Sequence, residues 1–179
     1  MSLKSNFELM AQYNQTMNGN IYRAAAQLSA ADLAKNQGAF FGSIINTLNH
    51  ILVADTIWLH RFACHQANFI TLDYVRELPV PISLDAVLYA DFIVLREHRE
   101  KMDRVITLFV TELSDTVIAT QLSYKNIKGL AFNKNFAHLL QHFFNHQTHH
   151  RGQVSTLLYQ QGIDIGVTDL LVNIPNIEN

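Results

Sequence analysis

The sequence predicts an all-α fold, a four-helix bundle built by a single domain over residues 1–179. Three observations support this prediction. Four segments place apolar side chains at alternating steps of three and four residues, the spacing of one helix face. The three prolines, at positions 79, 81 and 175, all lie outside these segments, so nothing interrupts long helices. No repeat or low-complexity linker divides the chain.

The first helix is predicted over about residues 3–28 and the second over about residues 43–63. Each has one continuous apolar stripe with a single polar interruption, Asn14 in the first and Asp55 in the second. Apolar side chains also cover most of the rest of the second segment, so this helix is expected to be buried on most sides.

The third helix is predicted over about residues 84–113, with Ser83 as its N-cap and Arg99 interrupting its stripe. The fourth is predicted over about residues 136–161 and ends before Gly162, a residue suited to the left-handed C′ position. Between them, TQLSYKNIKGLAF indicates a small β-hairpin around a Lys-Asn turn. The two long links, before and after the third helix, argue against a simple up-down-up-down topology.

The three polar interruptions, Asn14, Asp55 and Arg99, occupy core-facing positions on different helices. Buried charges need partners. We therefore predict that Asp55 and Arg99 pair, or share a polar network near the functional site. The alternative is that Arg99 extends outward to solvent and Asp55 bonds to local groups.

Composition restricts the class of protein. The net charge of −2 and the lack of a basic run argue against nucleic acid as a partner. No run reaches the roughly 18–20 apolar residues of a membrane span. The single cysteine, Cys64, and an N-terminal segment without a signal-peptide core fit a cytoplasmic protein. Apolar residues make up 49% and charged residues 16%, which suggests that a second copy covers part of the surface, as in a homodimer.

Five of the nine histidines lie in the fourth predicted helix. A helix advances by about 100° per residue. From the centre of the apolar face, His150 lies about 40° away and His146 about 80° away, at the edge of the core. His142, His149 and His138 lie about 120–160° away, toward solvent or an interface.

Two histidines at i and i+4 on one face can bind the same metal ion, as in helical zinc sites. The other interpretation is a pair of core-edge histidines bonded to backbone or to each other, and the spacing of His146 and His150 alone does not decide between them. Gln147 occupies the place of the glutamate that serves as general base in zinc proteases. A ferritin-like di-iron site is not expected, because no glutamate stands three residues before a histidine.

A third ligand has to come from another segment. His50 is mid-helix in an uncharged and largely apolar stretch, whereas the remaining histidines lie in charged or terminal segments. Alone, His50 would be interpreted as a neutral histidine bonded to a buried carbonyl. Together with His146 and His150 it becomes a candidate ligand. Three neutral imidazoles suit Zn²⁺, Ni²⁺ or Fe²⁺ and leave positions open for water or a thiolate.

Two neighbours of this group are further candidates for contact with a ligand. Gln153 projects on the same side as His146 and is a candidate to orient a ligand or a bound water, although a capping or interhelical hydrogen bond is equally consistent with its position. Arg151 is a candidate to neutralise an anionic cosubstrate, although the interpretation as a helix-surface arginine is the stronger one.

Several segments together resemble the DinB/YfiT-like family, the damage-inducible proteins and not the DNA polymerase of the same name. The matching pieces come in the family's order and cover nearly the whole chain: MAQYNQTMNGNIY, GAFFGSIINTLNHILVADTIWLHRF, LREHREKMD, LSYKNIKG and HLLQHFFNHQTHHRGQVSTLLYQQGIDIGVTDLL. The most specific pieces are HHRGQ and the TLNH segment, whose His50 is followed by Asp55 and Trp58, five and eight residues on. One departure is Thr16, where relatives often have tryptophan.

The resemblance implies an up-down-down-up four-helix bundle, commonly a homodimer, with a metal site of three histidines. Carried over by position, the ligands are His50, His146 and His150. Characterised relatives include S-transferases and isomerases that use a low-molecular-weight thiol. The expected function is therefore a metal-dependent thiol S-transferase or a hydrolase-like enzyme acting on a small electrophile. The alternative is a stress-response bundle that binds a metal or ligand without catalysis, and membership of the family does not decide between them.

Overall fold

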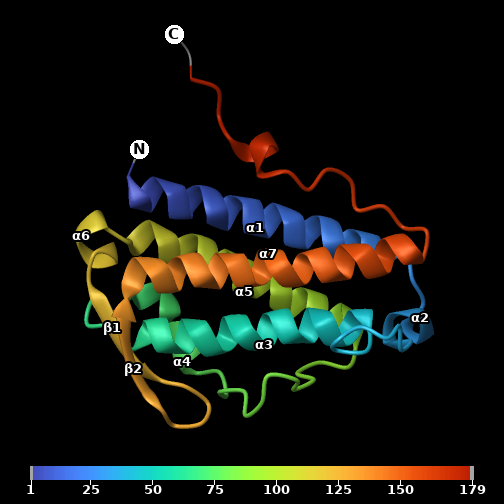
Figure 1. Cartoon of the computed structure of the whole chain (residues 1–179), viewed down its shortest axis with the longest axis horizontal. Helices are drawn as coiled ribbons and strands as arrows, with labels where there is room; N and C mark the ends of the chain where they lie inside the picture. Colours follow the sequence, from blue (N-terminus) through green and yellow to red (C-terminus); the bar gives the residue numbers. More distant parts are fainter. Residues whose placement is uncertain (1, 178–179) are drawn as a thin grey trace.

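The computed structural model describes residues 2–177, which are mostly helical with one small antiparallel sheet (Figure 1). Four long helices lie side by side: α1 (Leu3–Ala25), α3 (Ile44–Ala63), α5 (Phe92–Glu112) and α7 (Phe136–Gln160). Shorter elements connect and flank them: α2 (Ala30–Ala34), η1 (Ile70–Leu72), α4 (Asp73–Arg76), α6 (Asp115–Ile118), β1 (Gln121–Lys125), β2 (Ala131–Asn135) and η2 (Leu170–Asn173). None of the described helices is long and apolar enough to cross a membrane.

The long helices form one shared apolar core. Helix α1 packs against α5 and α7, and α3 packs against α7 and α5. Near the hairpin end, the buried Phe62 ring lies 5.4–5.8 Å from the rings of Phe109, Phe136 and Phe143, which come from α5 and α7. Aromatic pairs at this spacing add to the stabilisation from burial. This cluster fixes α3 and α7, the two helices that carry the candidate site, against each other.

The ends of the second and fourth predicted helices are confirmed to within one residue. Ser43 caps α3 by accepting a hydrogen bond from the Asn46 N–H. Gly162 follows α7 with a φ of +78°, and the N–H groups of Gly162 and Ile163 donate to the carbonyls of Tyr159 and Leu158. This is the Schellman arrangement, in which a left-handed residue at C′ is favourable for glycine.

The predicted start of the third helix is wrong: α5 begins at Phe92, with Asp91 as its N-cap, and residues 84–91 form a loop. Contacts with α3 hold this loop. The Asn49 amide accepts from the Tyr89 N–H and donates to the Tyr89 carbonyl, at 3.0 and 2.9 Å. The backbone of Tyr89 therefore bonds across to α3 rather than within a helical turn.

Two further features of the chain bear on the sequence predictions. The first helix ends at Ala25, three residues earlier than expected, because Ser29 caps the separate short helix α2. The predicted hairpin is confirmed: β1 and β2 pair antiparallel, and the Asn126 side chain accepts from two backbone N–H groups of the turn. Strand β2 leads directly into α7, where Asn135 caps the first turn.

The predicted pairing of Asp55 and Arg99 is confirmed. Arg99 Nη1 lies 2.5 Å from Asp55 Oδ2, and Arg99 Nη2 lies 2.9 Å from Asp103 Oδ1. Asn18 donates to Asp103 at 2.8 Å, so side chains of α1, α3 and α5 form a buried polar network. Burial raises the pKa of Asp55 to about 6 even though Arg99 opposes this. In residues 2–177, no hydrogen bond joins this pair to His50, His146 or His150.

Candidate metal centre

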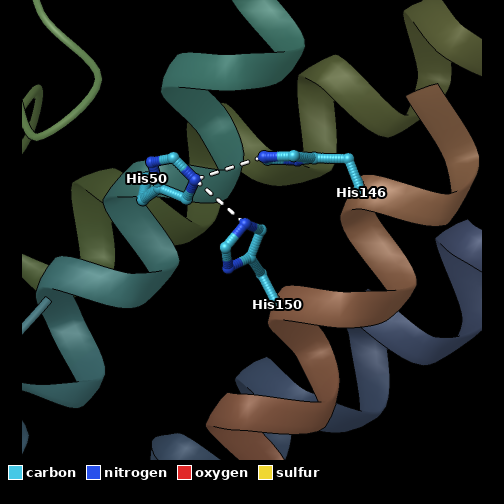
Figure 2. A group of neighbouring side chains, drawn as sticks. All are labelled: His50, His146 and His150. Atoms are coloured by element: carbon cyan, nitrogen blue, oxygen red, sulfur yellow. Dashed lines mark hydrogen bonds between the residues drawn. The ribbon is translucent and has the colours of Figure 1, made fainter. Parts of the chain in front are cut away.

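Three histidines from two helices converge on one point (Figure 2). His50 comes from α3, whereas His146 and His150 lie one turn apart on α7. His50 Nε2 lies 3.2 Å from His146 Nε2 and 3.1 Å from His150 Nε2. One ring nitrogen from each of the three lies within 4.8 Å of the others. His50 is buried, and His146 and His150 lie at the edge of the core, as the helical angles predicted.

The outer nitrogens of two of these rings are held by acceptors. His50 Nδ1 lies 2.7 Å from the Leu84 carbonyl oxygen, and His150 Nδ1 lies 2.8 Å from Gln153 Oε1. Because an oxygen of this kind only accepts, each Nδ1 carries the proton and donates it. In the neutral rings, Nε2 then has an unprotonated lone pair. The lone pairs of His50 and His150 therefore point at each other across 3.1 Å.

The surroundings keep these rings neutral. Burial lowers the pKa of His50 and of His150, and the hydrogen bonds to Leu84 and Gln153 only partly oppose this. Burial together with the neighbouring imidazoles of His150 and His50 lowers the pKa of His146 to about 3. Neutral imidazole is the form that binds a metal ion.

The geometry fits a transition metal. A zinc–nitrogen distance of about 2.0–2.1 Å and a tetrahedral angle place two ligand nitrogens about 3.3 Å apart. The two Nε2 distances from His50, 3.2 and 3.1 Å, are close to this value. In a chain without a cation, two lone pairs at this distance repel, so simple pairing of core-edge histidines accounts poorly for the arrangement. Three nitrogen donors match Zn²⁺, Ni²⁺ or Fe²⁺.

An aromatic side chain shields the group on one side. The Phe41 ring stacks on His50 with centroids 4.0 Å apart and meets His150 edge-on at 5.6 Å. Phe41 and the Leu84 carbonyl were not found from the sequence. Phe41 lies in a loop without periodicity, and a backbone carbonyl carries no signal in the side-chain pattern. Only the burial expected for His50 pointed to such partners.

The other candidate residues lie at different places. Gln153 bonds directly to His150, as a residue that orients a ligand would. Arg151 points away to α1, where it is buried and donates to Asn14, so the interpretation as a surface arginine is wrong. Asp55 and Arg99 pair with each other. The structure therefore brings only Gln153, of these four, into contact with the three histidines.

The remaining histidines of α7 do not join the group. His138, His142 and His149 are exposed, as predicted from their helical angles. His142 lies one helical turn before His146 on α7, and the centres of the two rings are 6.1 Å apart. Burial, and then the cations Lys134 and Arg61, lower the pKa of His142. His142 therefore lies between His146 and the side chains that lower its pKa, Lys134 and Arg61.

Comparison with known proteins identifies the family of the chain. The family model described as DinB family matches residues 1–177, essentially the whole chain. No curated protein and no solved structure matches the chain. The family match covers α3 and α7, the two helices that bring His50, His146 and His150 together, and the chain belongs to the DinB family.

Proposed function

We propose that this chain binds one divalent transition metal, zinc, nickel or iron, through Nε2 of His50, His146 and His150. The observation that carries the proposal is the convergence of the three nitrogens, with the outer nitrogens of His50 and His150 bonded to the Leu84 carbonyl and to Gln153. Such outer contacts fix the ring orientation and the tautomer of a metal ligand.

We propose further that the site serves a thiol-dependent S-transferase or a hydrolase-like enzyme. When bound, the metal supplies Lewis acidity that lowers the pKa of a thiol or of water. The chain contributes orientation and partial exclusion of water: Leu84 and Gln153 hold two rings, and Phe41 covers the face of His50. The three donors leave coordination positions for a cosubstrate.

The wider organisation is part of the same proposal. The long links on either side of α5 and the course of the chain in Figure 1 support an up-down-down-up bundle. Exposed apolar residues such as Phe40 and Ile82, 87% and 93% exposed, support coverage by a second copy in a homodimer. The free thiol of Cys64 is consistent with a cytoplasmic protein.

The test of activity is consumption of a low-molecular-weight thiol in the presence of a chloronitroarene. In this reaction a carbon–sulfur bond forms, chloride leaves with the electron pair of the broken bond, and the thiol proton passes to solvent. Zinc-loaded, nickel-loaded and iron-loaded protein should each be assayed beside the His146→Ala variant. Turnover that depends on the metal and is lost in the variant supports the enzyme.

Two other outcomes have distinct meanings. Tight, stoichiometric metal without turnover of thiols, or of ester and amide substrates, would favour the non-catalytic metal-binding bundle. No metal above background, together with unchanged stability of His146→Ala, would contradict the metal site itself.

A further inference from the structure

A pocket of about 590 Å³ lies between the β-hairpin, α3 and α7, and His142 is part of its lining. Its lining includes Trp58 from α3, Tyr124 and Lys134 from the hairpin, and His138 and His142 from α7. His142 connects this pocket with the metal centre, because its ring lies 6.1 Å from the His146 ring and 5.0 Å from the Trp58 ring. His142 therefore both lines the pocket and neighbours the three-histidine group.

The pocket lies in a part of the chain without acidic residues. Residues 116–163, which include the whole hairpin and α7, contain no aspartate or glutamate. The one acidic residue of α3, Asp55, is buried against Arg99. The protein as a whole has a net charge of −2, so this segregation is not a consequence of an excess of basic residues.

Lys134 lines the pocket, and Arg61, which lines a neighbouring pocket, packs on the two aromatic side chains of its wall. Lys134 is exposed and lines it, and the half-buried guanidinium of Arg61 lies 4.5 Å from the Trp58 ring centre and 4.9 Å from that of Tyr124. Within residues 2–177, neither side chain forms an ion pair. Positive groups beside a concave surface attract an anion.

The same walls offer aromatic surfaces. Trp58 and Tyr124 meet edge to face with their centroids 5.4 Å apart, and Trp58 is only partly buried. Arg61 lies over one face of each ring, and the remaining ring surface is suited to hold a flat molecule by burial of apolar surface. The pocket thus combines a flat apolar wall with unbalanced positive charge.

We infer that this pocket binds the carboxylate or phosphate end of a flat small-molecule substrate, with Lys134 at the oxyanion and Trp58 against the flat portion. The inference rests on the proposed function, because it places the other end of the molecule at the three histidines. It assigns a substrate class, small aromatic or similarly planar anions, that the three histidines alone do not specify.

Trp58 provides a direct readout, because it is the chain's only tryptophan. Fluorescence of the full-length protein should be titrated with benzoate, with phenyl phosphate and with the neutral analogue benzamide. Benzoate or phenyl phosphate should give a saturable change at concentrations at least about tenfold below those needed for benzamide, as expected when one charged hydrogen bond is lost. Response to only one of the two anions identifies which oxyanion the pocket prefers.

A matched pair of variants locates the contact. Lys134→Met should weaken binding of the preferred anion about tenfold, and Lys134→Glu should weaken it further. Lys128→Met removes an exposed lysine from the turn of the same hairpin, outside the pocket, and should leave binding unchanged. Equal effects of Lys134→Met and Lys128→Met, or benzamide binding as well as the anions, would overturn the inference.

The His50→Ala variant separates this inference from the proposed function. Anion binding that persists in a variant without metal supports the pocket even if the metal proposal fails. Conversely, wild-type protein that binds metal stoichiometrically but responds to neither anion would overturn the pocket alone.

Discussion

Arg99→Met should be among the most destabilising single changes in this protein. Arg99 is buried and contacts two buried carboxylates, at 2.5 Å to Asp55 and 2.9 Å to Asp103. Burial alone would lower the pKa of Arg99, but the two carboxylates outweigh it and raise that pKa, so the guanidinium is charged. Its removal leaves two buried carboxylates without a cation in contact, although Arg151 still acts on both from a distance, and this is expected to cost about 3–5 kcal/mol. Native domains have only about 5–15 kcal/mol of stability in total.

The loss should depend on pH with a definite sign. In the variant, Asp55 and Asp103 lose the effect of Arg99 and keep only the smaller effect of Arg151, so their pKa values rise above those in the wild type. The native variant therefore takes up protons as the pH falls, and the difference in stability from wild type should shrink between pH 7 and pH 5.

Urea unfolding followed by circular dichroism measures both effects. The matched control is Arg104→Met, an exposed arginine on the same helix, which should change stability by less than about 0.5 kcal/mol. If Arg99→Met does not fold, Asp55→Asn can be measured instead. This variant keeps the contact of Arg99 with Asp103, so its loss of unfolding free energy should be smaller, at about 1–3 kcal/mol. Similar stabilities of Arg99→Met and Arg104→Met, or a loss that grows at low pH, would refute the reasoning.

Three further predictions concern the site. In the folded chain the pKa of His146 is about 3, below its unfolded value of about 6.5, so unfolding takes up a proton between these pH values. Metal-free protein should therefore lose stability as the pH falls below about 6.5. In urea titrations His146→Gln should reduce this pH dependence of stability, and the same dependence in wild type and variant would contradict the prediction. Gln153→Leu should weaken zinc binding about tenfold in competition with a chelating dye, because His150 loses its acceptor, whereas the exposed Gln160→Leu should not; equal affinities would argue against the role of Gln153. Asn49→Ala should speed hydrogen exchange in residues 84–91 without changing that of α7; unchanged exchange in the loop would show that Asn49 does not hold it.

The sequence predicted the long helices because their apolar side chains recur at helical spacing, and it predicted the hairpin from its turn residues. It did not predict where α5 starts. Residues 84–91 carry apolar side chains that extend the helical pattern, but the Asn49 side chain, forty residues away in the chain, bonds the Tyr89 backbone in a non-helical conformation. Local spacing contains no information about such a contact.

The candidate site was predictable to a similar extent. By their helical positions, only His146 and His150 of the five α7 histidines are expected to face the core. The apolar surroundings of His50 made it the best candidate for the third ligand. The resemblance to the family gave the same three. Arg151 was misjudged, because a charged side chain on a helix is usually exposed, whereas Arg151 is buried and donates a hydrogen bond to Asn14 on α1. The Asp55–Arg99 pair could be predicted since each charge interrupts an otherwise apolar stripe.

The most direct test of the metal centre is elemental analysis of protein prepared without an affinity tag, after incubation with zinc, nickel or iron and removal of unbound ions. We expect one ion per chain in the wild type, and in His138→Ala, which changes an exposed histidine of the same helix. We expect near-complete loss of the ion in His50→Ala, with the fold retained by circular dichroism. Equal metal content in wild type and His50→Ala, or no ion bound by the wild type, would contradict the assignment of His50, His146 and His150 as a metal site.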